Sequence, residues 1–246
     1  MNRIRFLPLL LLLLACFSLQ SQGQDKNRIV IPVEDFATNN PDSVQWEPLE
    51  VKADNLTEYR LITEGDSVSV IRATSSNAAS GLIYQVDIDP KKYPIIQWRW
   101  KVSDVIDKGN VYSRDGDDYP ARIYLTFEYD RSKLGFRDKI KYWAIKTFTS
   151  YEIPLRSINY IWANGVEKGT IVPNPYTNWV QMFVCRTGRE QTGEWITETK
   201  NIYDHYQQAF GELPGRITGV AIMTDTDNTG ESVTGYYDDI IFKKAE

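Results

Sequence analysis

The chain has 246 residues, of which 13% are aromatic, and a formal net charge of −5. This acidic balance argues against a nucleic-acid partner, which would require a basic surface. The two cysteines, Cys16 and Cys185, exclude a framework of several disulfides, so the fold must depend on an apolar core.

Residues 1–23 have the layout of a secretory signal peptide. Two arginines precede a short apolar run, and small and polar residues follow it. The run is shorter than the roughly 20 apolar residues that a membrane-spanning helix needs. Two cleavage sites are possible for this leader. LLAC resembles a lipobox, which would leave a lipid anchor on Cys16, and SQG offers an ordinary cleavage site. We therefore expect an exported protein that is periplasmic, anchored to the outer membrane or secreted.

Residues 27–246 are expected to form one domain of short strands. Alternating apolar and polar residues between turns predict strands over residues 55–64, 67–73, 81–88, 95–102, 121–129, 158–163, 179–186, 217–224 and 236–242. Two helices are predicted, over Asp138 to Phe148 and over Asn201 to Phe210, the second ending at Gly211. This pattern predicts an all-β, jelly-roll-like antiparallel β-sandwich with two inserted short helices.

Two of these strands have a polar face. Along residues 95–102 the tryptophans share the core face with Ile and Val, and Arg99 lies on the other face. Along residues 121–129 the polar face carries Arg122 and Tyr124. Such a face is either solvated surface or the wall of a groove, where a ring stacks on Tyr124 and Arg122 holds hydroxyls or a carboxylate.

Further candidates for the same groove lie in nearby turns. Asp117 and Asp118 belong to an acidic turn just before residue 121, and Trp162 shares a strand face with Tyr160 ahead of an Asn-Gly turn.

The stretch TDTDNTG, residues 224–230, has several possible roles. As an EF-hand loop it would place Tyr236 at the position of the bidentate carboxylate, so that interpretation fails. Asp225 and Asp227 could form a catalytic carboxylate pair, although any Asp-x-Asp on a strand has this spacing. They could instead hold the turn through bonds to its backbone, or contact a ligand at the rim of the sandwich together with Asn228.

Several kinds of site lack the residues they need. His205 is the only histidine, and the pattern places it in a helix, where a packing role is the simpler interpretation. With Cys185 inside a strand, a His/Cys zinc site has too few ligands. The nucleotide-binding glycine motifs are absent from the sequence.

Five segments resemble an uncharacterised bacterial family, domain of unknown function (DUF) 3047. They are, in this order, WRWKV, GDDYPARIYLTF, VPNPYTNWVQMFV, FGELPGRITGVAIMTDTDNTG and YYDDIIF, and the resemblance covers about Ile31 to Lys243. The family brings no established activity with it.

A more distant resemblance is to the jelly-roll sandwiches of carbohydrate-binding modules and galactose-binding-like domains. It is carried by VEDF, by SGLIYQVDIDP with YPIIQWRWKV, and by GYYDDIIF at the closing strand. It implies a structural calcium held by an early Glu and an Asp of the closing strand, here Glu34 and Asp239, with Asp238 as the alternative.

The combined expectation is a domain that binds a saccharide or polysaccharide on a sheet face and rim. The residues expected there are Arg99, Asp117, Asp118, Arg122, Tyr124, Trp162, Asp225, Asp227 and Asn228, and the two arginines would favour an acidic sugar. The alternatives are a glycoside hydrolase or polysaccharide lyase on the same scaffold, and an envelope structural or protein-interaction module. We favour binding over catalysis, and we expect membrane contact only through a lipid anchor at Cys16.

Overall fold

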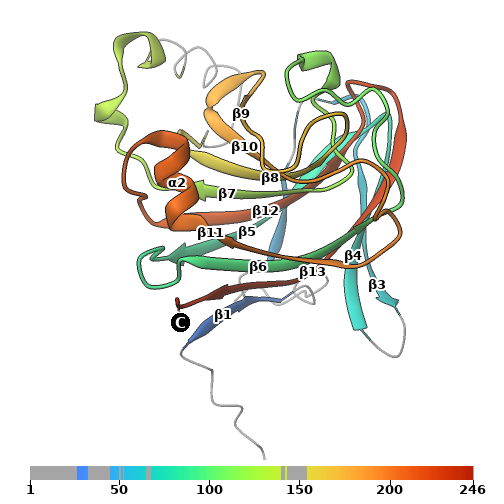
Figure 1. Ribbon diagram of the computed structural model, residues 1–246, viewed down its shortest axis with the longest axis horizontal. Coiled ribbons are helices and arrows are strands. Elements are labelled where there is room, and N and C mark those ends of the chain that lie inside the picture. Colours follow the sequence, from blue (N-terminus) through green and yellow to red (C-terminus); the bar gives the residue numbers. More distant parts are fainter. Residues whose placement is uncertain are drawn as a thin grey trace, which may run out of the picture.

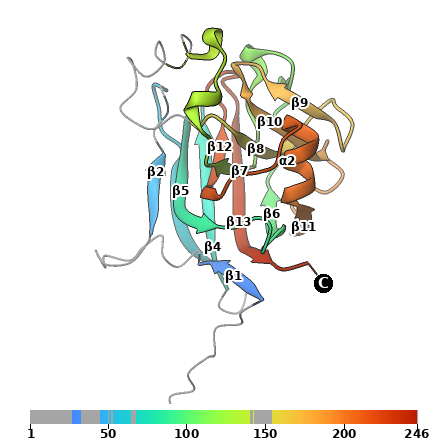
Figure 2. The same ribbon diagram turned by 90° about the vertical axis from the view of Figure 1, so that its left-hand side faces the viewer.

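The computed structural model describes residues 27–32, 45–49, 51, 53–64, 68–139, 142 and 154–245. In this part of the chain two sheets pack face to face as a β-sandwich (Figure 1), which confirms the expected all-β fold. Turning the view by 90° brings β2 and β5 to one side and α2 and β11 to the other (Figure 2). No helix within these described ranges is long and apolar enough to cross a bilayer.

The first sheet, which we call sheet A, has the strand order β11-β6-β13-β4-β3, with β1 pairing β13 as well. Its strands are β1 (Arg28–Ile31), β3 (Glu58–Glu64), β4 (Val68–Ser76), β6 (Ile95–Val102), β11 (Ile196–Asn201) and β13 (Ser232–Lys243).

The second sheet, sheet B, has the order β2-β5-β12-β7-β8-β10-β9. Its strands are β2 (Trp46–Leu49), β5 (Ala79–Ile88), β7 (Arg122–Phe127), β8 (Ser157–Ala163), β9 (Ile171–Asn174), β10 (Thr177–Thr187) and β12 (Ile217–Asp225). One feature differs from the expected antiparallel arrangement, because β8 and β10 pair in parallel.

The core lies between the sheets and is rich in aromatic rings. Alternation along β6 sends Trp98 and Trp100 inward, where both are 0% exposed, as the sequence pattern predicts. Trp98 stacks on Tyr160 of β8 at a centroid distance of 5.1 Å, and Trp100 lies 6.0 Å from Trp162. These contacts join the two sheets at their centre.

Helix α2 (Ile202–Phe210) closes one edge of the sandwich, as expected from its sequence. The side chain of Asn201 accepts a hydrogen bond from the Asp204 amide at its start, and Gly211 at φ 69° ends it. Its buried side chain Tyr206 packs on Phe127 at 4.7 Å. The other predicted helix, Asp138 to Phe148, lies largely outside the described residues, of which 136–139 and 142 are helical.

Candidate functional site

Three loops meet at one end of sheet B. They are the connection from β6 to β7, the β9–β10 turn and the connection from β12 to β13. The carboxylate of Asp118, before β7, accepts hydrogen bonds from the Thr229 amide at 2.7 Å and from the Asn228 side chain at 2.9 Å. One acidic residue therefore holds the loop that follows β12, through the type of side-chain-to-backbone bond that stabilises turns.

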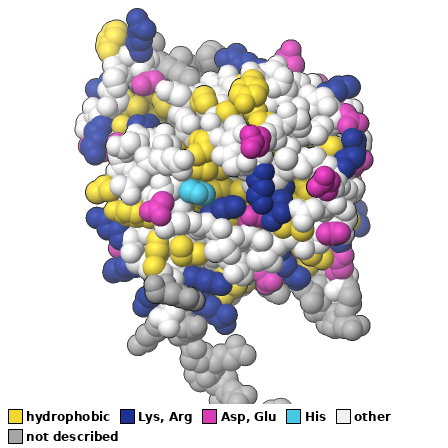
Figure 3. All heavy atoms as spheres, in the orientation of Figure 1, with side chains coloured by type: hydrophobic (Ala, Val, Ile, Leu, Met, Phe, Trp, Pro, Cys, Tyr) yellow, Lys and Arg dark blue, Asp and Glu magenta, His cyan; other side chains and the backbone are white. Residues whose placement is uncertain are grey.

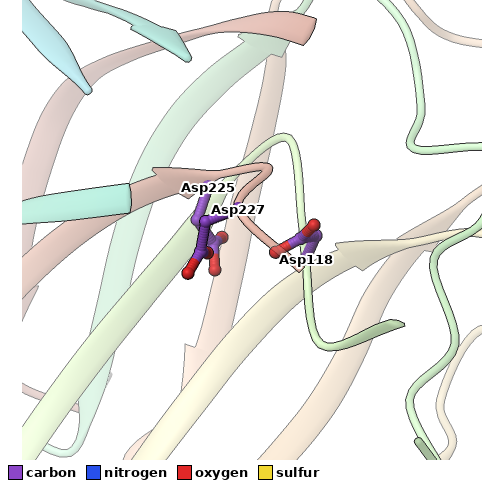
Figure 4. A group of neighbouring side chains, drawn as sticks. All are labelled: Asp118, Asp225 and Asp227. Carbon is purple, nitrogen blue, oxygen red and sulfur yellow. The ribbon is translucent and has the colours of Figure 1, made fainter. Parts of the chain in front are cut away.

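Four aspartates gather where these loops meet, and we call Asp117, Asp118, Asp225 and Asp227 the carboxylate cluster. Figure 4 shows Asp225 and Asp227 side by side at the end of β12, with Asp118 reaching toward them from the neighbouring loop. An oxygen of each of these three lies within 4.8 Å of the others. The sequence-based expectation that the two acidic turns come together is met by this geometry.

Arg122 is buried beneath the cluster and is only 2% exposed. Its Nε donates to Asp225 at 2.8 Å, and a second guanidinium nitrogen pairs with the other oxygen of the same carboxylate. The remaining donors reach the Asp117 carbonyl at 2.6 Å and the Tyr124 hydroxyl at 3.0 Å, and the Tyr119 ring lies 4.5 Å away. A guanidinium tolerates such burial because its charge and its donors are matched by these partners.

In the part of the chain that the structure describes, the expected groove built on Arg122 and Asp225 is therefore absent. Arg122 and Asp225 bind each other below the surface, and Asp117 and Asp118 are also buried at 5% and 1% exposure. The alternation of β7 correctly placed Arg122 on the face away from the core. Tyr119 and the loop before β7 cover that face, and the strand pattern carries no information about this cover. Tyr124 remains partly exposed beside Arg122.

Two further residues of the expected groove lie elsewhere. Trp162 is 1% exposed, packs in the core and donates its indole N–H to the Gly188 carbonyl at 3.2 Å, so it offers no stacking surface. Arg99 lies on sheet A, where it pairs with Asp238 and Asp239 and stacks on Trp195 at 4.7 Å. The expectation that Arg99 and Trp162 lie beside Arg122 is therefore wrong. Arg99 is on the opposite sheet, and the Trp162 side chain lies in the core.

The expected structural calcium involves Glu34, which lies outside the described residues. Its partner Asp239 has a positive φ of 51° and an oxygen 3.0 Å from Arg99 Nε, and it shares this guanidinium with Asp238, the alternative ligand.

The carboxylate cluster contains the donor types that a hard cation prefers. Three of its members are already engaged, however. Asp225 is bound by Arg122, Asp118 by the amides of the following loop, and Asp117 by the Asn174 side chain at 2.8 Å. Asp227 is the least engaged, with one contact of 3.4 Å from Asn228. A cation at this place would share the cluster with the Arg122 guanidinium.

Burial raises the pKa of two aspartates of the cluster. Burial raises the pKa of Asp117, and the nearby Arg122 opposes this. Burial also raises the pKa of Asp227, and the charge of Asp118 adds to the effect. Asp227 therefore ionises at a free-energy cost, which is typical of groups at functional sites and also of structural clusters.

The outer part of this end is exposed, and we call Arg114, Tyr176, Asp227 and Asn228 the rim. Tyr176 is 47% exposed and donates its hydroxyl to the Asn228 side-chain oxygen at 3.0 Å. Arg114 stacks on the Tyr176 ring at 5.1 Å and donates to the Pro175 carbonyl at 3.2 Å. Tyr176 was not among the predicted site residues, although an aromatic residue directly after Asn-Pro, in a turn, is a poor core candidate and could have been identified.

The single histidine packs rather than participating in a cluster of metal ligands. His205 stacks on Phe183 at 4.5 Å, and its Nδ1 lies 3.1 Å from the Tyr160 hydroxyl. It is visible on the face drawn in Figure 3, where basic and acidic side chains are interspersed.

Comparisons with known proteins give little functional information. No curated protein matches the chain. Among solved structures, a family 30 carbohydrate-binding module of a Clostridium thermocellum cellulosomal cellulase is similar, with 10% identity and a TM-score of 0.39, over 80% of this chain and 87% of that one. A β-1,2-glucanase from Parabacteroides distasonis has 11% identity and a TM-score of 0.35, over 77% of this chain and 22% of the glucanase. The family model for protein of unknown function (DUF3047) matches residues 44–241, so the chain belongs to this family.

Proposed function

We propose that this protein binds a saccharide at the rim. The observation that carries the proposal is the hydrogen-bonded series from Tyr176 through Asn228 to Asp118 and Asp227, which three separate loops hold together. An exposed ring is thereby fixed next to an amide and a carboxylate. Stacking on an aromatic ring and hydrogen bonds to hydroxyls are the two interactions that a sugar offers.

The rim is organised before any ligand arrives, which lowers the entropic cost of binding. Arg114 supports one side of the Tyr176 ring, and Asp118 holds Asn228 from below. The ring face away from Arg114 is the one proposed to receive the sugar. Asp227 would accept hydrogen bonds from its hydroxyls.

The charges of this region favour a neutral sugar over the acidic one suggested by the sequence. Four carboxylates face two guanidiniums: Arg122 is used by Asp225 and Asp117, and Arg114 lies at the rim against the Tyr176 ring. Arg99, the second cation of the original expectation, is on the other sheet and is also neutralised. A carboxylate on the ligand would therefore be repelled at the rim.

Binding is favoured over hydrolysis because Asp225 does not have the freedom of a catalytic acid or base. Both of its oxygens face Arg122, and the residue is 1% exposed. With the leader, the proposal describes an exported saccharide-binding domain.

The proposal is tested by screening the full chain on a glycan array and measuring the strongest ligand by calorimetry. Tyr176→Ala and Asp227→Asn are each expected to weaken binding about tenfold, which corresponds to about 1.4 kcal/mol. Phe136→Ala is the matched control, because Phe136 is an aromatic side chain that is 79% exposed outside the rim. Glycan binding that neither rim variant weakens would reject the rim, and the absence of any glycan ligand would reject the function. Capture of an envelope protein instead would favour the protein-interaction alternative.

A further inference from the structure

A cavity of about 540 Å³ lies at a different place, between the segment that follows β7 and the turn that follows α2. Its walls include Glu128, Tyr129 and Asp130 on one side and Tyr206, Glu212 and Leu213 on the other. This volume is within the range of small-molecule sites. None of these residues belongs to the rim or to the carboxylate cluster.

The walls of the cavity are held in place by their neighbours. Arg156 lies 4.1 Å from the Tyr129 ring and 5.0 Å from the Phe210 ring, and its Nε donates to Glu212 at 2.8 Å. The two wall segments also approach each other closely at Gly215, where a Cβ would lie 2.4 Å from the Glu128 carbonyl oxygen. Any larger residue at this position would separate the walls.

The cavity has a negative electrostatic character. Glu128, Asp130 and Glu212 contribute three carboxylates; among the described residues Arg156 pairs with Glu212, while the charges of Arg216 and Lys133 act on Glu128 and Asp130 without an ion pair within 4 Å. Among the described residues that line the cavity, one is a cation, Lys133. The carboxyl end of α2, which has no basic residue in its last turn, adds the negative end of the helix dipole. Hydrogen bonds from Ser132 lower the pKa of Asp130, so this carboxylate stays ionised at neutral pH.

We propose that this cavity binds an amino sugar, with the ammonium group between Glu128 and Asp130 and the sugar ring against Tyr129 and Leu213. Unpaired carboxylates favour a cation, and aromatic rings favour both a cation and the apolar face of a sugar. Leu213, which is 57% exposed, supplies an apolar surface, and Glu212 supplies an acceptor for a hydroxyl. This site is independent of the saccharide binding proposed for the rim.

The test compares two ligands that differ in the group on each sugar nitrogen, which is a protonated amine in one and a neutral acetamide in the other. Glucosamine oligomers and their N-acetylated counterparts are titrated into the full chain at about pH 6, below the ordinary pKa of an amine. We expect the protonated oligomer to bind at least about tenfold more tightly. Glu128→Gln combined with Asp130→Asn should abolish this preference, and both side chains are exposed, so the variant is expected to fold.

Tyr176→Ala at the rim is the control and should leave the preference unchanged, which separates failure of this inference from failure of the rim. Equal affinity for the two oligomers, no binding of either, or a preference that survives the double substitution would overturn the inference. Competition by free lysine as strong as by glucosamine would overturn it too, since the site would then recognise an amine without the sugar.

Discussion

Replacement of Arg122 by methionine tests whether the buried ion pair holds the loop end of sheet B together. The substitution keeps an unbranched side chain but removes the charge and all the donors to Asp225, Asp117 and Tyr124. Asp225, at 1% exposure, is then left as a buried carboxylate that retains only the 3.2 Å bond from the Tyr119 amide.

Breaking a buried ion pair in this way costs about 3–5 kcal/mol. For a protein of this size, each kcal/mol lowers the melting temperature by about 2–4 °C, so a decrease of about 10 °C is expected. The free energy of unfolding is measured by urea denaturation of the full chain, together with thermal melting. Adding Asp225→Leu removes the stranded carboxylate and should restore part of the loss, with a coupling of about 2 kcal/mol between the two sites.

Arg189→Met is the matched control, because Arg189 is 53% exposed and pairs with Asp104 at 2.8 Å and Asp107 at 2.6 Å. A surface pair of this kind contributes at most about 1 kcal/mol. If Arg122→Met costs no more than Arg189→Met, or if the double variant loses the full sum of the single losses, the buried pair is not the element that holds this region.

Three other measurements follow from the environments of single residues. Burial raises the pKa of the Cys185 thiol to about 12, so iodoacetamide at about pH 8 should leave Cys185 unmodified in the native protein and label it fully in denaturant, as read by peptide mass spectrometry; rapid labelling of Cys185 in the native protein would contradict the burial. Burial raises the pKa of Asp227 above its unfolded value of about 3.9, so its ionised form destabilises the folded protein at neutral pH. Asp227→Asn should therefore stabilise the protein at neutral pH, and this gain should disappear toward about pH 4, where the carboxylate becomes protonated. Burial, together with Lys200, lowers the pKa of His205 below about 6.5, so the neutral ring stabilises the fold above that pH and this contribution is lost as the pH falls through the lowered pKa. His205→Phe should therefore lose less stability between about pH 7.5 and about pH 5.5 than the wild type, and an unchanged pH dependence would show that another group is responsible.

Local pattern was sufficient to predict much of the fold. The alternation of β6 predicted both its bounds and its core face, and the helix over Asn201 to Phe210 was predicted to end at Gly211, as it does. Four strands were missed, for two reasons. β1, β2 and β9 have four residues each, too few to show a period, and β11 reads ITETKN, whose polar residues become a strand only by pairing with β6.

The candidate site shows where local pattern stops. Two contacts of the site join distant parts of the sequence: Asp118 and Asn228 are 110 residues apart, and Arg122 and Asp225 are 103 apart. Both pairs were nevertheless expected on one side of the molecule, because their residues belong to polar turns or polar strand faces. The pattern could not show that the β6–β7 connection covers the outer face of sheet B. All seven residues of β8 are buried, since Val111 and Tyr119 pack over its second face, and the same loop encloses Arg122. A period-two pattern describes the two sides of a strand but not what a distant loop places on them.

The position of β13 has a consequence for how the molecule is made. This strand follows all the other described strands in the sequence, yet it lies in the interior of sheet A, bonded to β6 along one side and to β4 and β1 along the other. Emergence of the polypeptide in order therefore leaves β6 and β4 without their shared neighbour until Ser232–Lys243 is free, a delay typical of pairings between distant segments. We expect nascent chains that stop before Ser232 to remain sensitive to proteases, and the addition of a peptide spanning Ser232–Lys243 to restore their resistance.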